Sequence, residues 1–137
     1  MFPADTKFLV VDDFATMRKI LKKVLTELGY TNIEEADDGK PAFAALEKAH
    51  NEGKPFQFVI SDWNMPGMTG IDLLKACKAD AKFKTLPFML VTAESEQKNI
   101  VEAAKAGVSD YVVKPFNAAT LKGKLERIWS KHDQKAA

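Results

Sequence analysis

Short apolar runs alternate along the chain with stretches in which apolar residues recur every three or four positions. The first run, residues 8–11, reads FLVV, and helical spacing follows it up to Gly29. Steps of three and four put side chains on one face of a helix, whereas a short β-rich run is typical of a buried strand. The pattern predicts a strand at 8–11 and a helix that ends before Gly29. The residues expected on its inward face are Met17, Ile20, Leu21, Val24, Leu25 and Leu28.

The same alternation repeats four more times. We expect further strands at residues 32–36, 56–61, 86–92 and 108–113. Helices should follow each of them: one with Pro41 in its first turn, then 71–79, 97–106 and 118–132. Short strands that are apolar on both faces and alternate with helices indicate a parallel sheet covered on both sides. We therefore predict an α/β fold with a doubly wound, five-stranded parallel sheet and five helices, in a single domain over residues 1–137.

Composition narrows the class of protein. The 137 residues carry 20 basic and 19 acidic side chains, a balance that argues against a nucleic-acid-binding surface. Cys77 is the single cysteine, so no disulfide can form within the chain, which fits a reducing compartment. The amino terminus does not resemble a signal peptide, and apolar residues nowhere run long enough to span a membrane. We expect a cytoplasmic protein with no membrane partner.

Polar residues stand where the predicted strands end. Asp12 and Asp13 follow the first strand, Asp62 the third, Thr92 the fourth and Lys114 the fifth. Sites in open α/β sheets form at the carboxyl ends of the strands. Each residue also has an ordinary structural explanation: a helix cap for an aspartate, a side-chain turn for the threonine, a solvated charge for the lysine.

Taken together, these residues favour a magnesium site. Three carboxylates packed close raise one another's pKa, a cost that a divalent cation would relieve, and Mg²⁺ prefers oxygen ligands. Zinc is not expected, because His50 and His132 stand alone at predicted surface positions. A carboxylate, a cation, a lysine and a hydroxyl suit phosphoryl transfer. Asp62 is the expected nucleophile, since Asp12 and Asp13 are adjacent and are expected to belong to the metal.

Four motifs in this order and spacing resemble the receiver domain of bacterial two-component response regulators. They are VVDD, SDWNMPGMTG, VTAE and YVVKPF, and the longer stretches FLVVDDFATMRKI and KPFNAATL narrow the resemblance to the single-domain chemotaxis regulators. The resemblance covers about residues 6–132. It implies the strand order 2-1-3-4-5, the order of flavodoxin and of these regulators themselves.

The resemblance also implies a set of metal ligands. Asp13 and the backbone carbonyl of Asn64 would bind Mg²⁺ directly, beside the phosphoacceptor Asp62. Asp12 would help through its own carboxylate or through a bound water.

The remaining roles concern the phosphoryl group and its effect. Thr92 would hydrogen-bond the phosphoryl group, and Lys114 would pair with it, its backbone held by a cis bond to Pro115. Tyr111 would be the rotameric switch. The partner would bind a surface that includes Ile100, Tyr111 and Lys124.

By this resemblance the chain is a signalling switch and not an enzyme, although it would catalyse its own phosphorylation and dephosphorylation. A histidine kinase would supply the phosphoryl group, a phosphatase could remove it, and a flagellar motor switch protein would bind the monomer. A phosphate sink or a regulator of another partner is the alternative. Two features bear on that choice. Residues 95–97 are less basic than expected of a motor-binding face, and Gly123 lies inside the last helix.

Two other classes of protein fit less well. Phosphatases of the haloacid dehalogenase type need a second aspartate two residues after the nucleophile, where this chain has Asn64. Flavodoxins need a phosphate-binding loop rich in Ser, Thr and Gly after the first strand, where this chain has Asp12 and Asp13. Beside Asp62, Trp63 and Met65 are expected to be exposed, either as loop packing or as contacts for a phosphodonor.

Overall fold

A computed structural model describes residues 2–65, 67–93, 97–114 and 116–136 of the chain. The strands are β1 (Phe8–Val11), β2 (Ile33–Ala36), β3 (Phe58–Asp62), β4 (Phe88–Ala93) and β5 (Asp110–Lys114). The helices are α1 (Ala15–Glu27), α2 (Gly39–Asn51), α3 (Gly70–Lys78), α4 (Gln97–Ala106) and α5 (Ala118–Ala136). All strand pairs are parallel and the order is β2-β1-β3-β4-β5, which confirms the predicted fold class.

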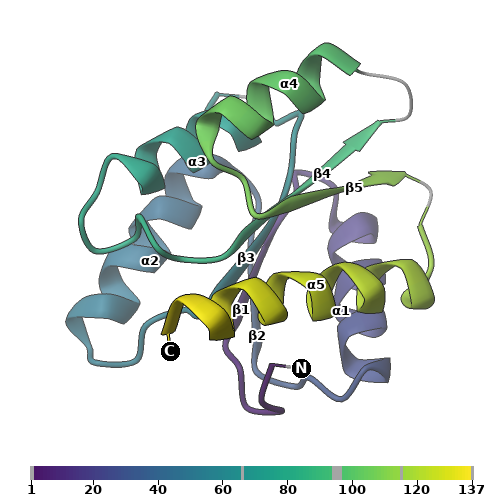
Figure 1. The fold of residues 1–137 in the computed structure, drawn as a ribbon. Coiled ribbons are helices and arrows are strands. Elements are labelled where there is room, and N and C mark those ends of the chain that lie inside the picture. The colour runs from purple at the N-terminus through teal and green to yellow at the C-terminus, as the bar shows by residue number, and fades with distance from the viewer. Residues whose placement is uncertain (1, 66, 94–96, 115, 137) are drawn as a thin grey trace.

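Helices cover both faces of the sheet (Figure 1). Successive residues of a strand point to opposite faces, so β1 supplies Leu9 and Val11 to one core and Phe8 and Val10 to the other. The first core lies under α2, α3 and α4, and the second lies under α1 and α5. The central strands β1 and β3 are fully buried, and parallel pairing holds the carboxyl ends of β1, β3, β4 and β5 in fixed register.

Several local predictions differ from the structure. Ile20 is 43% exposed, because α1 buries a narrower face built on Leu21 and Leu25. Trp63 and Met65 are buried, at 7% and 6% exposure, so the expectation that they are exposed beside the site was wrong. Helix α5 continues past His132 to Ala136, since no glycine or proline interrupts the polar residues that follow it.

Some of the predictions fall on residues that the structure does not describe. Ser95, Glu96 and Pro115 are outside the described residues, and so are the side chains of Ile100 and His132. Within the described part of the chain, no helix combines the length and apolar character needed to cross a membrane.

Candidate functional site

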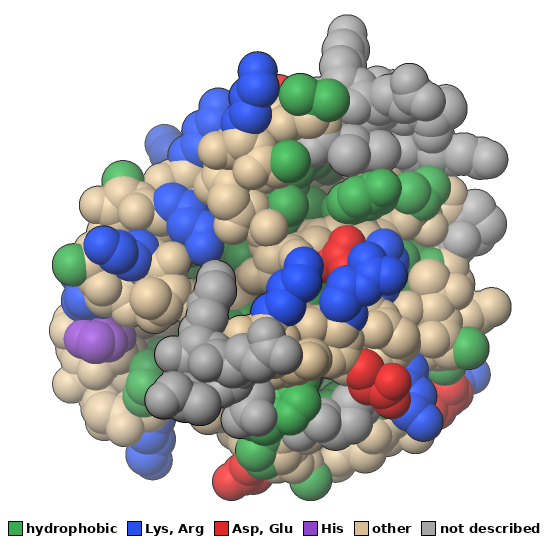
Figure 2. Space-filling model, viewed as in Figure 1, with side chains coloured by type: hydrophobic (Ala, Val, Ile, Leu, Met, Phe, Trp, Pro, Cys, Tyr) green, Lys and Arg blue, Asp and Glu red, His purple; other side chains and the backbone are tan. Residues whose placement is uncertain are grey.

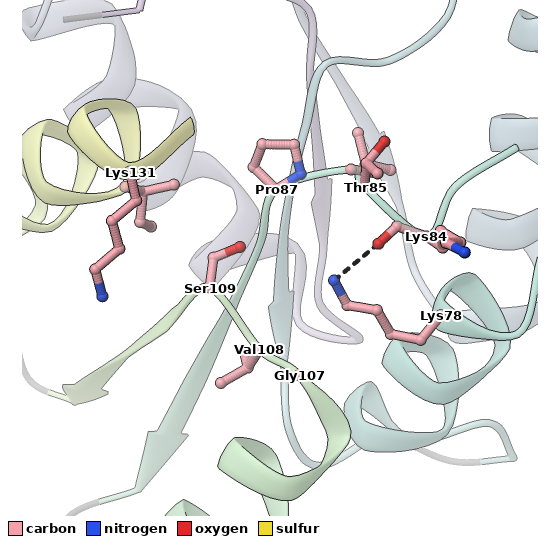
Figure 3. A pocket seen from close by; sticks show the side chains of 10 residues that line it. Lys78, Lys84, Thr85, Pro87, Gly107, Val108, Ser109 and Lys131 are labelled. Carbon is pink, nitrogen blue, oxygen red and sulfur yellow. Dashed lines mark hydrogen bonds between the residues drawn. The ribbon is translucent and has the colours of Figure 1, made fainter. Parts of the chain in front are cut away.

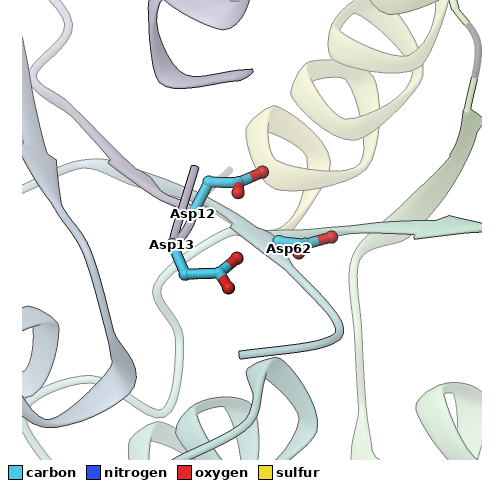
Figure 4. A group of neighbouring side chains, drawn as sticks. All are labelled: Asp12, Asp13 and Asp62. Atoms are coloured by element: carbon cyan, nitrogen blue, oxygen red, sulfur yellow. The ribbon is translucent and has the colours of Figure 1, made fainter. Parts of the chain in front are cut away.

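Three aspartates from two neighbouring strands meet at the carboxyl edge of the sheet (Figure 4). β1 pairs with β3 so that Val11 lies opposite Ser61, which brings Asp12 and Asp13 next to Asp62. One carboxylate oxygen from each aspartate lies within 4.8 Å of the others. The structure thus brings together the carboxylates that the sequence placed at separate strand ends.

Two of the three aspartates are withdrawn from water, and Asp13 is half-buried. Asp12 is fully buried and Asp62 is 4% exposed. Within the described residues, Asp12 Oδ2 and Asp13 Oδ1 are buried without a hydrogen-bond donor. A buried carboxylate oxygen without a partner is costly, because it has lost its hydration without replacement.

Burial and mutual repulsion change the acidity of these groups. Burial, chiefly, raises the pKa of Asp12 from 3.8 to about 6; the charges of Asp62 and Asp13 add to this, while the Phe14 amide and Lys114 oppose it. Burial likewise raises the pKa of Asp62, and Lys114 counteracts part of the rise. Both shifts show that the site disfavours its own negative charge, as a site for a cation would.

Among the described residues, Lys114, the last residue of β5, is the single lysine that forms ion pairs with this cluster. Its Nζ lies 3.1 Å from Asp62 Oδ1 and 3.9 Å from Asp12 Oδ2. The first distance is that of a hydrogen-bonded ion pair, while the second is only an electrostatic contact. One ammonium cannot neutralise three carboxylates, so the site retains negative charge.

Arg18, which we did not single out in the sequence, fixes the backbone of this acidic turn. Its Nη1 donates to the carbonyl oxygen of Asp12 at 2.6 Å, and its Nε pairs with Glu35 at 3.1 Å. The backbone N–H of Phe14 donates to Asp12 Oδ1 at 2.9 Å. Sequence spacing gives no direct signal for Arg18, because its contact with Glu35 depends on how α1 packs beside β2.

The loop that follows Asp62 is held close to the strand it leaves. The N–H of Gly70 donates to the carbonyl of Trp63 at 2.9 Å, and a Cβ at Gly70 would overlap the carbonyl oxygen of Asp62. Gly67 has a φ of 72°, a value that side-chain-bearing residues rarely adopt. Thr69 then starts α3 with a capping box. The glycines of this stretch therefore allow the chain to turn back tightly beside Asp62.

The other predicted site residues lie on β4, β5 and α5. Thr92 is buried and pairs in register with Val113, next to Lys114. Tyr111 is half-buried, and Lys124 Nζ lies 4.9 Å from the centre of its ring. Asn64 is exposed in the loop after Asp62. The predicted switch residue Tyr111 and the predicted partner-surface residue Lys124 are therefore in contact.

The donor set fits a hard divalent cation. The available ligands are carboxylate oxygens, two of them buried without a donor, and the described residues place no histidine or cysteine among them. Mg²⁺ takes a few carboxylates and keeps several waters, whereas zinc prefers nitrogen and sulfur. These residues suit Mg²⁺.

Comparison with known proteins gives consistent matches. The family model described as response regulator receiver domain matches residues 8–126. The chain is 54% identical over 125 residues to the chemotaxis protein CheY-3 of Vibrio cholerae serotype O1, covering 91% of this chain and 92% of the relative. It is equally similar to the chemotaxis protein CheY of Pseudomonas aeruginosa, covering 91% of this chain and 97% of that one.

Solved structures agree with this fold. The chemotaxis response regulator CheY4 of Vibrio cholerae superposes with a TM-score of 0.79 at 35% identity, over 90% of this chain and 98% of that one. The receiver domain of a signal transduction histidine kinase from Syntrophus aciditrophicus has a TM-score of 0.79 at 28% identity, over 92% and 91% of the two chains.

Proposed function

Because the chain belongs to the response regulator receiver domain family, we propose that it is a signalling switch that accepts a phosphoryl group on Asp62. The observation that carries this proposal is the position of Asp62 at the end of β3, within a cluster of three carboxylates and in an ion pair with Lys114. A histidine kinase is the proposed source of the phosphoryl group.

Asp12, Asp13 and Asp62, with the backbone carbonyl of Asn64, are the residues proposed to hold Mg²⁺. The bound ion would neutralise negative charge on the phosphoryl oxygens during transfer. The two carboxylate oxygens that are buried without a hydrogen-bond donor support this assignment. Asp12 is proposed to act through its own carboxylate or through a water molecule.

Asp62 is the proposed nucleophile. A carboxylate oxygen of Asp62 forms a bond to phosphorus while the bond from phosphorus to the donor nitrogen breaks, and the imidazole of the donor takes up a proton as it leaves. Lys114, now 3.1 Å from Asp62 Oδ1, would transfer its hydrogen bond to the phosphoryl oxygens. The Thr92 hydroxyl, buried on the adjacent strand, would donate to the same group. Attack of water on the phosphorus would release phosphate from Asp62, so the same site would also catalyse dephosphorylation.

Chemotaxis is the proposed setting, since the two curated relatives are named chemotaxis proteins and share 54% of their aligned residues with this chain. We propose a monomer in the cytoplasm whose phosphorylated form binds a flagellar motor switch protein and which a phosphatase can reset. The proposed surface comprises Ile100, Tyr111 and Lys124. Phosphorylation would draw Thr92 toward Asp62 and let the Tyr111 ring turn inward. Service as a phosphate sink is the alternative.

Intact mass spectrometry tests the assignment. Wild-type protein incubated with Mg²⁺ and a small phosphodonor should gain one phosphoryl group, and Asp62→Asn should gain none. Asp72→Asn, which changes an exposed carboxylate on α3, is the matched control and should behave as wild type. Phosphorylation of Asp62→Asn at the wild-type rate would show that the assignment is wrong.

A further inference from the structure

A second pocket lies at the opposite edge of the sheet from the aspartates, where β4 and β5 begin (Figure 3). Its volume is about 470 Å³, within the range of roughly 300 to 1,000 Å³ typical of small-molecule sites. Its walls come from the end of α3, the loop before β4, the loop before β5 and the last part of α5. None of these walls includes a residue of the phosphorylation site.

The polar lining of this pocket is entirely cationic or hydroxylic. Lys78, Lys84 and Lys131 line it together with Thr85 and Ser109, and no acidic side chain is among the ten lining residues. The whole chain has a net charge of only +1, so this concentration of positive charge is local. On the face that carries α4 and α5, lysine and arginine side chains are widespread and acidic ones are few (Figure 2).

Lysines at helix carboxyl ends often serve only to offset the helix dipole, an effect limited to the last turn. That explanation suits Lys78, the final residue of α3. It does not suit Lys84, which lies in the loop between α3 and β4, or Lys131, which lies more than one turn before the end of α5 at Ala136. Two of the three lysines therefore have no such structural role.

Two of the lining side chains, those of Lys78 and Ser109, are held in place by their neighbours. Lys78 Nζ donates to the carbonyl of Lys84 at 3.1 Å, which ties the end of α3 to the loop. Ser109 Oγ accepts the N–H of Phe88 at 3.0 Å. This bond uses an oxygen lone pair, so the Ser109 hydroxyl keeps its proton for donation. Figure 3 shows Ser109 between Lys131 and Lys78.

The remaining walls are apolar. Pro87 and Ile128 are buried, and Leu86 and Val108 are partly buried beside them. A site with an apolar wall and several ammonium groups suits a ligand that has both a flat or apolar part and phosphate oxygens, for which lysine is a common partner. We propose that this pocket binds a phosphorylated small molecule of nucleotide size, such as a nucleoside diphosphate.

Titration of ¹⁵N-labelled full-length protein with ADP, without divalent cations, tests the proposal. Omitting the metal keeps phosphate away from the aspartates, which repel it. Amide shifts should centre on residues 84–86 and 107–109, and the double variant Lys84→Gln with Lys131→Gln should bind at least about tenfold more weakly. The matched control, Lys19→Gln with Lys23→Gln on exposed positions of α1, should bind within about twofold of wild type.

Two further probes separate the contributions of the phosphate groups and of the adenosine part to ADP binding. Pyrophosphate should bind more weakly than ADP, and adenosine more weakly still, because each lacks one part of the recognised chemistry. Equal binding of pyrophosphate and ADP would overturn the assigned ligand class. Absence of shifts at these residues, or equal weakening in the control variant, would overturn the site. Unchanged melting temperatures in both double variants would exclude unfolding as the cause.

Discussion

The carboxyl and amino edges of one sheet carry opposite charges that are held in different ways. At the carboxyl edge, the short side chains of Asp12 and Asp62 are buried and that of Asp13 is half-buried, and the pKa of Asp12 is raised to about 6. At the amino edge, Lys84 and Lys131 extend from exposed positions on long, flexible side chains. Buried charge is costly without a partner, whereas exposed charge costs little. The carboxyl edge therefore depends on a cation far more than the amino edge depends on an anion.

Removing one carboxylate should produce the largest of the expected effects, a loss of Mg²⁺ affinity at the carboxyl edge. Asp13→Asn should weaken Mg²⁺ binding about a hundredfold or more, on the order of 3 kcal/mol, because a charged ligand is lost. The metal-free variant should melt at a higher temperature than wild type, since repulsion among the aspartates falls. Calorimetric titration and thermal melting measure the two effects. Wild-type Mg²⁺ affinity in this variant would exclude Asp13 as a ligand.

Mg²⁺ binding should also stabilise the wild-type fold, by nearly as much free energy as the Asp13→Asn change removes from Mg²⁺ binding. At a free concentration of about one hundred times Kd the gain is about 2.7 kcal/mol, or roughly 5 to 10 °C in Tm for a chain of this size. Trp63, which directly follows Asp62, should change its fluorescence on the same titration. An unchanged Tm and unchanged emission at tens of millimolar Mg²⁺ would contradict a cation site.

The carboxyl edge should respond to pH through Asp12. In the folded state the pKa of Asp12 is about 6, above its ordinary 3.8, so the folded metal-free protein holds this proton more tightly. Its stability should fall as the pH rises from about 4 to about 6 and then level off. Mg²⁺ needs the ionised carboxylate, so its affinity should drop by up to about tenfold per pH unit below 6.

Calorimetric titrations of Mg²⁺ binding from pH 4.5 to 8 would check this. Mg²⁺ affinity that is constant down to pH 4.5 would show that the Asp12 carboxylate does not take part.

Salt should produce the smallest of the expected effects. It should weaken binding at the amino edge more than binding at the carboxyl edge. Exposed charges are screened over about 8 Å at physiological ionic strength, and buried ones much less. Raising NaCl from about 50 to about 300 mM should weaken ADP binding several-fold and Mg²⁺ binding proportionately less. A steeper salt dependence for Mg²⁺ than for ADP would contradict the assignment of buried and exposed charge.

Sequence patterns predicted the fold well because its determinants are local. The alternation of short apolar runs with helical spacing follows from periods of 2 and 3.6 residues, and the structure confirms the parallel sheet and its order. The meeting of Asp12, Asp13, Asp62 and Lys114 was also predictable, since parallel strands end at one edge. Their roles in binding metal and phosphoryl groups remain predictions.

Features that depend on packing could not be read from the sequence. Ile20 fits the apolar spacing of α1, but the width of the buried face is decided by α5 and the sheet. Trp63 follows the strand end but belongs to the buried core under α2, α3 and α4, a packing that its position in the sequence does not reveal. The contact of Arg18 with the Asp12 carbonyl, and the presence of Lys78, Lys84 and Lys131 around one pocket, join segments far apart in the sequence.

Strand β2 lies at one end of the strand order and thus leaves one side of its backbone without a neighbouring strand. Such edges can template the addition of strands from other molecules and so promote aggregation. Here the edge has only four residues, and two of them are the glutamates Glu34 and Glu35, which pair with Lys7 and Arg18 of the same molecule. The short length and the charged side chains protect the protein from edge-to-edge polymerisation at high concentration.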